Sequence, residues 1–320
     1  MEARPTFREQ IQSNWAADKR VCLELNSEFD RLPHSLTNRQ YANFHHDLRF
    51  SPQTTFNHAI VNATADLLCA IKINPICYAD NAEGERVLEN TTWYIHQYYP
   101  DIPIIGDVTN SNKGAAQMAF DRFGFDAVTV HPYLGHDTLA PFLAYPGKGL
   151  FVLCNTTNPD SREFQQMPID IESCLHSGLL TSDEYEMLVN LTGQREKLDY
   201  RSATLSEMVA FLAAKRWDRW GNIGLVVEAT HPETFALTRR LAPTLPFLIP
   251  ITDPQDSNLK NILKFAADHY NEGIIISSAN LIYTSFGTDF ADAARDATLT
   301  LHEEIIRLRQ PSAARQSPLL

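Results

Sequence analysis

Eight short apolar runs, each five to seven residues long, recur along the chain with amphipathic segments between them. Their nearly continuous hydrophobic character is typical of parallel strands that are buried on both faces. The predicted strands are Val21–Asn26, Leu68–Ile73, Ile102–Asp107, Ala127–His131, Leu150–Asn155, Ile223–Ala229, Phe247–Ile251 and Gly273–Ser278.

Helical patterns fill most of the gaps between these runs. They predict helices over Phe56–Leu67, Gly84–Tyr98, Gly114–Phe123, Pro232–Leu241 and Ser257–Asn271, and a leading helix, Phe7–Ala17, that closes the bottom of a barrel. Eight βα units in 320 residues predict an α/β protein with the (β/α)8 TIM-barrel fold. The alternative is an open doubly wound sheet, but such a sheet usually carries a glycine-rich turn after its first strand, and this chain has none there.

One domain, residues 1–310, accounts for the whole pattern. The stretch from about 160 to 221, between the fifth and sixth strands, is too long for a single crossover. Helical patterns at Ser182–Leu191 and Leu205–Trp220 predict that this stretch is a helical insertion. Residues 311–320 are expected to form a disordered tail.

The composition narrows the choice of partners. Hydrophobic residues make up 44% of the chain and charged residues 21%, as in a globular protein with a large core. The net charge of −12 offers no basic surface to nucleic acid or to an anionic membrane. No apolar run approaches the roughly 20 residues of a membrane span, and the N-terminal segment has no signal-peptide core.

The five cysteines lack metal-ligand spacing, and their number is odd. We therefore expect a reduced, cytoplasmic protein. Cys154 is the only cysteine at a strand end and so the only candidate for a catalytic thiol.

In a barrel of this kind the chemistry gathers at the carboxyl ends of the strands. Lys72 is the most unusual residue there, because Ile71 and Ile73 flank it in a buried strand. A buried ammonium needs a partner or a lowered pKa, and Asp107 at the end of the next strand is the expected partner. The pair is either catalytic or a structural ion pair that closes the barrel mouth.

A second candidate cluster combines Asp107, His131 and Glu228, which could hold a divalent metal ion. Neither HxH nor HExxH spacing supports that hypothesis, and His131 could instead hydrogen-bond a substrate oxygen. Other polar residues at the strand ends are candidates for substrate binding: Asn26, Asn74, Thr109, Asn155, Thr156 and Ser278.

Several blocks of this sequence resemble the orotidine 5′-phosphate decarboxylases of the longer bacterial subgroup. They are residues 7–26, 56–74, 102–116, 126–158 and 224–245, and the most specific block is HPYLGHDTLAPFLAYPGKGLFVLC, which begins at His131. The resemblance covers most of the chain from Phe7 to about Tyr283. It implies the same barrel.

The resemblance also identifies departures from the family's catalytic centre, which is a Lys–Asp–Lys–Asp network. Its first lysine corresponds to Lys72, and the rest comes from a DxKxxD motif that runs here from Asp107 to Asn112. Asp107 is kept, but Thr109 stands in the place of the proton-donating lysine and Asn112 replaces the second aspartate. The family's strand-one aspartate is Asn26 in this chain.

The phosphate-binding residues have changed as well. After the seventh strand, where the family has a glycine-rich loop, residues 252–257 read TDPQDS, and only Gln255 fits. The arginine expected after the last strand is Ala279. A phosphate dianion would lose its backbone nest and its guanidinium partner, and Asp253 and Asp256 would repel it.

These departures predict a different reaction. Decarboxylation of orotidylate leaves a carbanion with no conjugated electron sink, so it requires an ammonium at that carbon, and Thr109 cannot supply a proton at neutral pH. A β-keto acid forms an enolate instead, whose oxygen one lysine or one metal ion can stabilise.

We therefore predict a carbon–carbon lyase that acts on a small anionic metabolite of the β-keto acid type. Lys72 or a divalent metal stabilises the enolate, Asp107 orients Lys72 or ligates the metal, and His131 transfers the proton. The alternative is a catalytically inactive descendant that serves as a binding or scaffold protein. The resemblance further implies a homodimer in which the residue at the position of Asn112 is contributed across the interface, and it adds Asn112 and Gln255 to the candidates for substrate binding.

Overall fold

Eight parallel strands close into a barrel in the computed structural model of the chain, which describes residues 4–37, 51–79, 83–108, 112–156, 158–193, 201–228, 232–252 and 258–309. The strands follow one another around the barrel in the order β1-β10-β9-β8-β5-β4-β3-β2. Their bounds are β1 (Val21–Glu24), β2 (Leu68–Ile73), β3 (Ile104–Asp107), β4 (Ala127–Val130), β5 (Gly149–Asn155), β8 (Ile223–Val227), β9 (Phe247–Pro250) and β10 (Ile274–Ser278). Each coincides with one of the eight apolar runs, so the predicted TIM barrel is confirmed.

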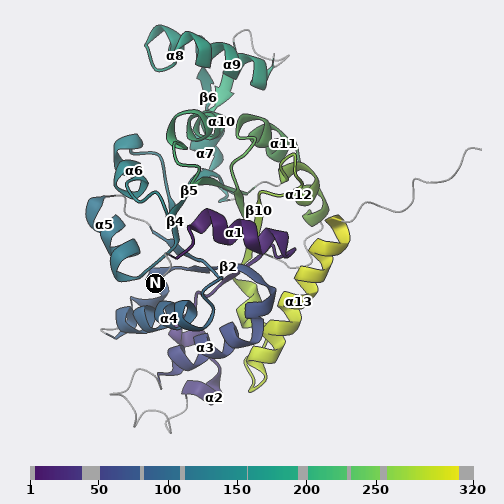
Figure 1. Cartoon of the computed structure of the whole chain (residues 1–320). Coiled ribbons are helices and arrows are strands. Elements are labelled where there is room, and N and C mark those ends of the chain that lie inside the picture. Colours follow the sequence, from purple (N-terminus) through teal and green to yellow (C-terminus); the bar gives the residue numbers. More distant parts are fainter. Residues whose placement is uncertain are drawn as a thin grey trace, which may run out of the picture.

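Helices surround the barrel (Figure 1). They are α1 (Phe7–Ala16), α2 (His34–Thr37), α3 (Pro52–Thr64), α4 (Gly84–Tyr98), α5 (Lys113–Gln117), α6 (His136–Leu143), α7 (Arg162–Gln165), α8 (Ile171–His176), α9 (Ser182–Thr192), α10 (Leu205–Leu212), α11 (Pro232–Leu241), α12 (Leu259–Ala266) and α13 (Phe290–Arg309). Short 3-10 segments are η1 (Phe29–Arg31), η4 (Ala65–Leu67), η5 (Pro75–Tyr78) and η8 (Asn280–Tyr283), and the π-helical segments η6 (Met118–Arg122) and η7 (Ala213–Trp217) follow α5 and α10. No helix in these described ranges combines the length and apolar character needed to cross a membrane.

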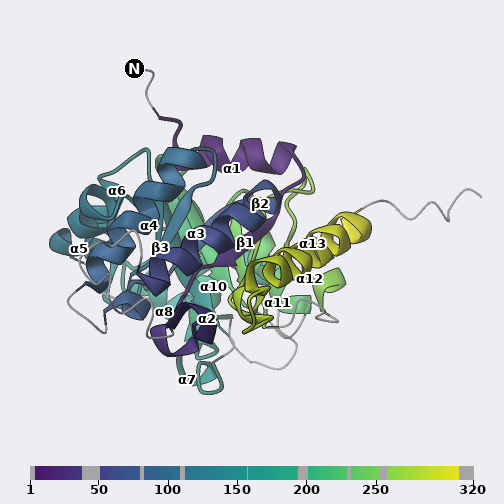
Figure 2. The same ribbon diagram turned by 90° about the horizontal axis from the view of Figure 1, so that it is seen from below.

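Helix α1 closes the N-terminal end of the barrel, as the sequence predicts (Figures 1 and 2). Phe7, Ile11 and Trp15 lie on one face of the helix and belong to the same apolar cluster as the side chains inside the barrel. The indole Nε1 of Trp15 donates a hydrogen bond of 3.0 Å to the carbonyl oxygen of Ile274. The helix therefore acts as the floor of the barrel interior.

Gly149 makes room for this floor. The ring of Phe7 packs edge-to-face on Phe151 with 5.7 Å between the ring centroids. A Cβ atom at Gly149 would lie 2.4 Å from Cδ1 of Phe7, which is closer than side chains pack. Only glycine permits this approach of α1 to the start of β5.

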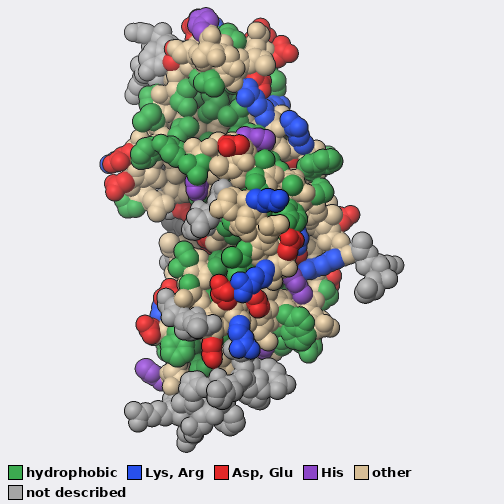
Figure 3. All heavy atoms as spheres, turned by 90° about the vertical axis from the view of Figure 1, so that its left-hand side faces the viewer, with side chains coloured by type: hydrophobic (Ala, Val, Ile, Leu, Met, Phe, Trp, Pro, Cys, Tyr) green, Lys and Arg blue, Asp and Glu red, His purple; other side chains and the backbone are tan. Residues whose placement is uncertain are grey.

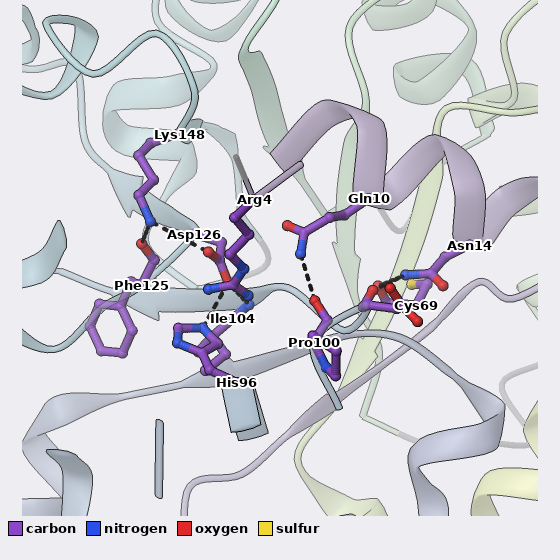
Figure 4. A network of polar contacts seen from close by, with 11 residues as sticks. Arg4, Gln10, Asn14, Cys69, His96, Pro100, Ile104, Phe125, Asp126 and Lys148 are labelled. Carbon is purple, nitrogen blue, oxygen red and sulfur yellow. Dashed lines mark hydrogen bonds and ion pairs between the residues drawn. The ribbon is translucent and has the colours of Figure 1, made fainter. Parts of the chain in front are cut away.

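A buried carboxylate, Asp126, ties the same end of the barrel together (Figure 4). Its Oδ2 lies 3.1 Å from Nη2 of Arg4, 3.1 Å from Nε2 of His96 and 3.0 Å from the backbone nitrogen of Ile104. Its Oδ1 lies 3.4 Å from Nζ of Lys148. Burial alone would raise the pKa of Asp126, but the hydrogen bond and charge of His96 and the charges of Lys148 and Arg4 lower it below its usual value.

The chain between β5 and β8 differs in detail from the predicted helical insertion. Besides α7, α8 and α9 it contains an antiparallel pair of strands, β6 (Pro168–Asp170) and β7 (Ser202–Thr204), and with α8 and α9 this pair extends away from the barrel (Figure 1). Helix α10 contacts β5 and α11, so it is the crossover helix of the barrel rather than part of the insertion. The guanidinium of Arg216 in η7 forms two bonds, of 2.6 and 2.5 Å, to the carboxylate of Glu184 in α9 and so joins the insertion to the barrel.

The long C-terminal helix α13 packs against α3 and was not among the predicted elements. The predicted tail, residues 311–320, lies outside the described residues.

Candidate active site

The interior of the barrel changes from apolar to polar at the carboxyl ends of five adjacent strands. Alternate residues of a strand point to the same face, so each polar residue here follows an interior apolar residue by two positions. The pairs are Ile275 and Ser277 on β10, Cys22 and Glu24 on β1, Ala70 and Lys72 on β2, Ile105 and Asp107 on β3, and Ala127 and Thr129 on β4. We call Ser277, Glu24, Lys72, Asp107 and Thr129 the polar arc.

Lys72 is the centre of the polar arc. Its Nζ lies 3.0 Å from Oδ2 of Asp107 and 3.4 Å from Oε2 of Glu24. Strand pairing sets this geometry, because Lys72 is the direct partner of Glu24 across β1 and β2, while Asp107 lies two residues beyond Ile105, the partner of Lys72 on β3. The predicted Lys72–Asp107 pair is confirmed. Glu24, a polar residue at the end of the first strand, is a second carboxylate partner that the sequence analysis did not assign to Lys72.

In both Glu24 and Asp107, the carboxylate oxygen that does not face Lys72 accepts a hydrogen bond from a hydroxyl group. Oγ of Ser277 donates to Oε1 of Glu24 at 2.9 Å, and Oγ1 of Thr129 donates to Oδ1 of Asp107 at 2.5 Å. Nδ2 of Asn26 also donates to Oε2 of Glu24 at 3.2 Å. The arc is therefore one continuous chain of polar contacts from β10 through β4.

The charge state of Lys72 follows from its surroundings. Burial alone would lower the pKa of Lys72, but the charges of Glu24 and Asp107 outweigh burial and raise the pKa above its usual value. Lys72 is consequently a permanent ammonium at neutral pH. An ammonium has three N–H donors, and among the described residues the two carboxylates take two of them.

Two tyrosines fix the loop that follows β1. The hydroxyl of Tyr78 donates to the carbonyl oxygen of Leu25 at 2.9 Å. The hydroxyl of Tyr283 donates to the carbonyl oxygen of Asn26 at 2.7 Å and accepts a bond of 2.9 Å from the backbone nitrogen of Glu28. These bonds to distant elements hold Glu24 and Asn26 in place at the strand end.

Asn26 and Asn74, both predicted to bind substrate, contact each other at the edge of the arc. The backbone nitrogen of Asn74 donates to Oδ1 of Asn26 at 2.8 Å. The Asn74 side chain caps η5, because its Oδ1 accepts a bond of 3.0 Å from the backbone nitrogen of Ile76. The Asn26 side chain thus contacts a carboxylate that binds the ammonium, whereas the carbonyl of the Asn74 side chain has a structural role.

Asn155 and Thr156, both predicted to bind substrate, lie on the other side of the barrel mouth. Side chains of the insertion form hydrogen bonds with both residues. Gln165 at the end of α7 accepts a bond of 2.7 Å from the backbone nitrogen of Thr156 and donates one of 3.0 Å to its Oγ1. Gln166 donates to Oδ1 of Asn155 at 3.0 Å, and Nδ2 of Asn155 donates to the carbonyl oxygen of Glu228. The view in Figure 2 places α7 at the end of the barrel opposite α1.

The remaining predicted residues do not join these groups. Ser278 lies on the opposite face of β10 from Ser277, since Ile276 belongs to the outer core and Ile275 to the interior. Asn112 is exposed and caps α5, with its Oδ1 accepting from the backbone nitrogen of Ala115 at 2.9 Å. Thr109 and Gln255 lie outside the described residues.

The predicted metal cluster does not form. Within the described ranges, which include Asp107, His131 and Glu228, no three His, Cys, Asp or Glu side chains are placed to hold a metal ion. His131 follows the end of β4 and is partly exposed. These three residues come from strands around much of the barrel, and a shared position at strand ends does not by itself bring side chains within ligand distance.

The surroundings of Cys154 do not favour the thiolate that a catalytic cysteine needs. It is buried, its Sγ donates to the carbonyl oxygen of Ser206 at 3.2 Å, and burial raises its pKa to about 12. All five cysteines are free, as the sequence predicts.

A groove lies beside the mouth, between η5, α4 and η6. It is lined by Pro75, Ile76, Leu88, Met118 and Phe123 among others, and Ile76 and Met118 are 57% and 45% exposed. On the side of the molecule that carries α5 and α6, hydrophobic side chains lie among charged ones (Figure 3).

The comparisons with known proteins agree with this architecture. Residues 57–279 match the model of the orotidine 5′-phosphate decarboxylase / HUMPS family. The chain is 34% identical over 311 residues to orotidine 5′-phosphate decarboxylase of Cupriavidus metallidurans, covering 95% of this chain and 99% of the relative. The corresponding enzyme of Cellvibrio japonicus is 32% identical over 309 residues, covering 94% and 98%.

Solved structures give the same result. The OMP decarboxylase of Leishmania donovani superimposes with a TM-score of 0.69 at 25% identity, covering 95% of this chain and 98% of that one. The relatives are decarboxylases, which are carbon–carbon lyases. The barrel, the polar arc at its carboxyl end and these matches together place the chain in the orotidine 5′-phosphate decarboxylase / HUMPS family.

Proposed function

We propose that this protein is a carbon–carbon lyase that decarboxylates, or forms an enolate from, a small anionic metabolite of the β-keto acid type rather than orotidylate. The observation that carries the proposal is the buried Lys72 ammonium, held by Glu24 and Asp107 at the carboxyl end of the barrel. Such a group is a preorganised positive charge in a partly water-excluded site, where it is worth more than in water.

The proposed reaction needs only one such charge. When a β-keto acid loses carbon dioxide, the electron pair of the broken carbon–carbon bond moves into the enolate and its negative charge moves onto oxygen. No described residue takes the third N–H of Lys72, which in this proposal donates to that oxygen while Lys72 keeps its proton. His131, at the end of β4, is the proposed donor of the proton that the carbon takes up.

The sequence supports a substrate other than orotidylate, although the relatives are named for that substrate. By the family resemblance, Thr109 and Asn112 stand where the family motif has its second lysine and second aspartate, and Ala279 stands where it has an arginine. The predicted substrate contacts that border the arc, Asn26 above all, remain part of this proposal.

One observation favours the rival proposal of an inactive binding or scaffold protein. Gln165 and Gln166 already occupy hydrogen-bonding atoms of Asn155 and Thr156, so the insertion satisfies polar groups that a substrate would otherwise meet. The two proposals differ over whether a substrate displaces these glutamines.

A turnover screen separates the alternatives. Purified protein is mixed with a panel of β-keto acids and with orotidylate, each with and without Mg²⁺, Mn²⁺ or Zn²⁺, and release of carbon dioxide is measured. We expect turnover of at least one β-keto acid and none of orotidylate. No turnover under any condition, with no binding of any of the three metal ions by calorimetry, overturns the lyase in favour of the binding protein, and turnover of orotidylate overturns the change of substrate.

We also propose that the protein is a homodimer, as the family resemblance implies, with Asn112 at the interface. Its exposed position at the start of α5, near the exposed Met118 of η6, supports this arrangement. Light scattering should give twice the chain mass of 36.2 kDa, and Met118→Glu should weaken the dimer. A monomeric mass for the unmodified protein contradicts the proposal.

A further inference from the structure

We infer that Glu24 is a positioning residue of the reaction centre: from β1 its carboxylate holds the Lys72 ammonium, together with Asp107 from β3, at the place where the substrate's negative charge develops. The reaction in this statement rests on the proposed function. The hold on Lys72 is a property of the folded protein and can be tested without a substrate.

The burial of Glu24 is the first argument. The residue is 7% exposed and follows an apolar interior position, Cys22, on its strand. A carboxylate at such a depth costs free energy unless it is paired and hydrogen-bonded. Here Lys72 supplies the charge, and Ser277 and Asn26 supply the hydrogen bonds.

The direction of the contacts is the second argument. Glu24 is the direct partner of Lys72 in the strand register, whereas Asp107 lies two residues beyond the partner of Lys72 on β3 and so nearer the barrel mouth. The ammonium therefore lies between a deeper carboxylate and a shallower one. The Asp107 side chain is 33% exposed, whereas the Lys72 and Glu24 side chains are 11% and 10% exposed, so a ligand entering the mouth meets Asp107 first. Both oxygens of Glu24 are already engaged by Lys72, Asn26 and Ser277, which supports a role for Glu24 through Lys72.

A role for stability alone accounts less well for this arrangement. Replacing a buried ion pair by well-packed apolar groups is often neutral or stabilising. The formal charge of Lys72, Glu24 and Asp107 together is −1, since one positive charge faces two negative ones. A second carboxylate adds little to pairing that Asp107 already provides, but it fixes the ammonium in two directions and keeps it protonated.

Competitive acetylation measures this hold directly. The protein is treated with a trace of acetic anhydride at a series of pH values, and labelling of Lys72 relative to the exposed Lys113 is read by peptide mass spectrometry. In Glu24→Gln we expect about tenfold more labelling of Lys72 at pH 9, which corresponds to a fall of about one pKa unit, because one of its two carboxylates is gone. Glu24→Asp, which keeps the charge but shortens the reach, should give an intermediate increase.

Glu28→Gln is the matched control, because Glu28 lies in the same loop and is exposed. Lys72 should be acetylated to the same extent in Glu28→Gln as in the unmodified protein. If Glu24→Gln fails to fold by circular dichroism, Ser277→Ala decides the question, since it removes the hydroxyl that holds Oε1 of Glu24 and should raise labelling about twofold. Labelling of Lys72 that does not change in the folded variants overturns the inference.

The outcomes for the two proposals are separable. If the labelling changes as expected and the screen finds no substrate, Glu24 holds Lys72 but the lyase proposal fails. With a substrate in hand, Glu24→Gln should lower kcat about tenfold and leave KM nearly unchanged, with partial recovery in Glu24→Asp. A change confined to KM contradicts a positioning role.

Discussion

At the N-terminal end of the barrel the buried Asp126 is contacted by Arg4, His96 and Lys148, whereas at the carboxyl end the buried Lys72 is contacted by Glu24 and Asp107. At each end, a buried ionisable side chain thus contacts two or three ionisable side chains of the opposite type. Opposite charges shift the pKa in both cases so that the buried group stays ionised, downward for Asp126 and upward for Lys72.

The two ends differ in what surrounds these charges. Both oxygens of Asp126 are engaged, one of them also by the backbone nitrogen of Ile104, and α1 covers the barrel floor nearby (Figure 4). Lys72 instead lies beside a partly exposed Asp107 at the end opposite α1. Under the proposed function, Asp126 holds the fold together and Lys72 serves a ligand, and the partial exposure of Asp107 is the structural difference that supports these two roles.

The largest expected effect on stability is at the closed end. Asp126→Asn removes the carboxylate that Arg4, His96 and Lys148 contact, and it should lower the free energy of unfolding by about 3 kcal/mol. Urea denaturation measures the loss, with Asp101→Asn, an exposed aspartate, as the control. Turnover of any substrate found by the screen should stay within twofold of normal. Loss of activity in a stable, folded Asp126→Asn protein would contradict the claim that Asp126 serves stability and not the reaction.

A smaller effect is expected from the barrel floor. Gly149→Ala places a Cβ against the ring of Phe7 and should cost about 2 kcal/mol, because the ring must move out of the interior. Gly147→Ala is the matched control, since its Cβ would meet only Thr6, at an ordinary 3.8 Å. Hydrogen exchange should show faster opening of α1 in the first variant only. Equal stability of the two variants would mean that the packing of Phe7 against Gly149 does not contribute to stability.

The smallest effects should appear only at extreme pH and in opposite directions. The lowered pKa of Asp126 gives stability that is present above the ordinary aspartate pKa of about 3.9 and is lost as the pH falls further. The raised pKa of Lys72 gives stability that is present below the ordinary lysine pKa of about 10.4 and is lost as the pH rises through its value in the folded protein. The free energy of unfolding should therefore depend less on pH in the acid range in Asp126→Asn, and less on pH in the alkaline range in Lys72→Met. An unchanged pH dependence in the acid range for Asp126→Asn, or in the alkaline range for Lys72→Met, would contradict the pKa shift assigned to that residue.

The sequence was sufficient for the barrel and for the central ion pair. Parallel strands buried on both faces must be apolar, so each of the eight strands left a readable run, and a lysine between two isoleucines required a charged partner nearby. Glu24 carries the same signal, a charged residue between Leu23 and Leu25 at a strand end, and the same reasoning could have paired it with Lys72.

The rest of the site depended on information that short-range patterns do not contain. Which of Ser277 and Ser278 faces the interior depends on strand register, and a shift of one residue exchanges the two faces. The contacts of Gln165 and Gln166 depend on how the insertion folds back over the end of β5. Asp126 is joined to Arg4 across 122 positions of the chain, which no periodicity can reveal.

The most direct test of the central claim is the rate of carbon dioxide release by Lys72→Met beside Lys113→Met, an exposed lysine at the start of α5, on a β-keto acid that the unmodified protein turns over. The account predicts that Lys72→Met lowers the rate about a hundredfold or more and that Lys113→Met leaves it unchanged. A Lys72→Met protein that keeps its rate, or a Lys113→Met protein that loses it, would contradict the assignment of Lys72 as the charge that stabilises the enolate.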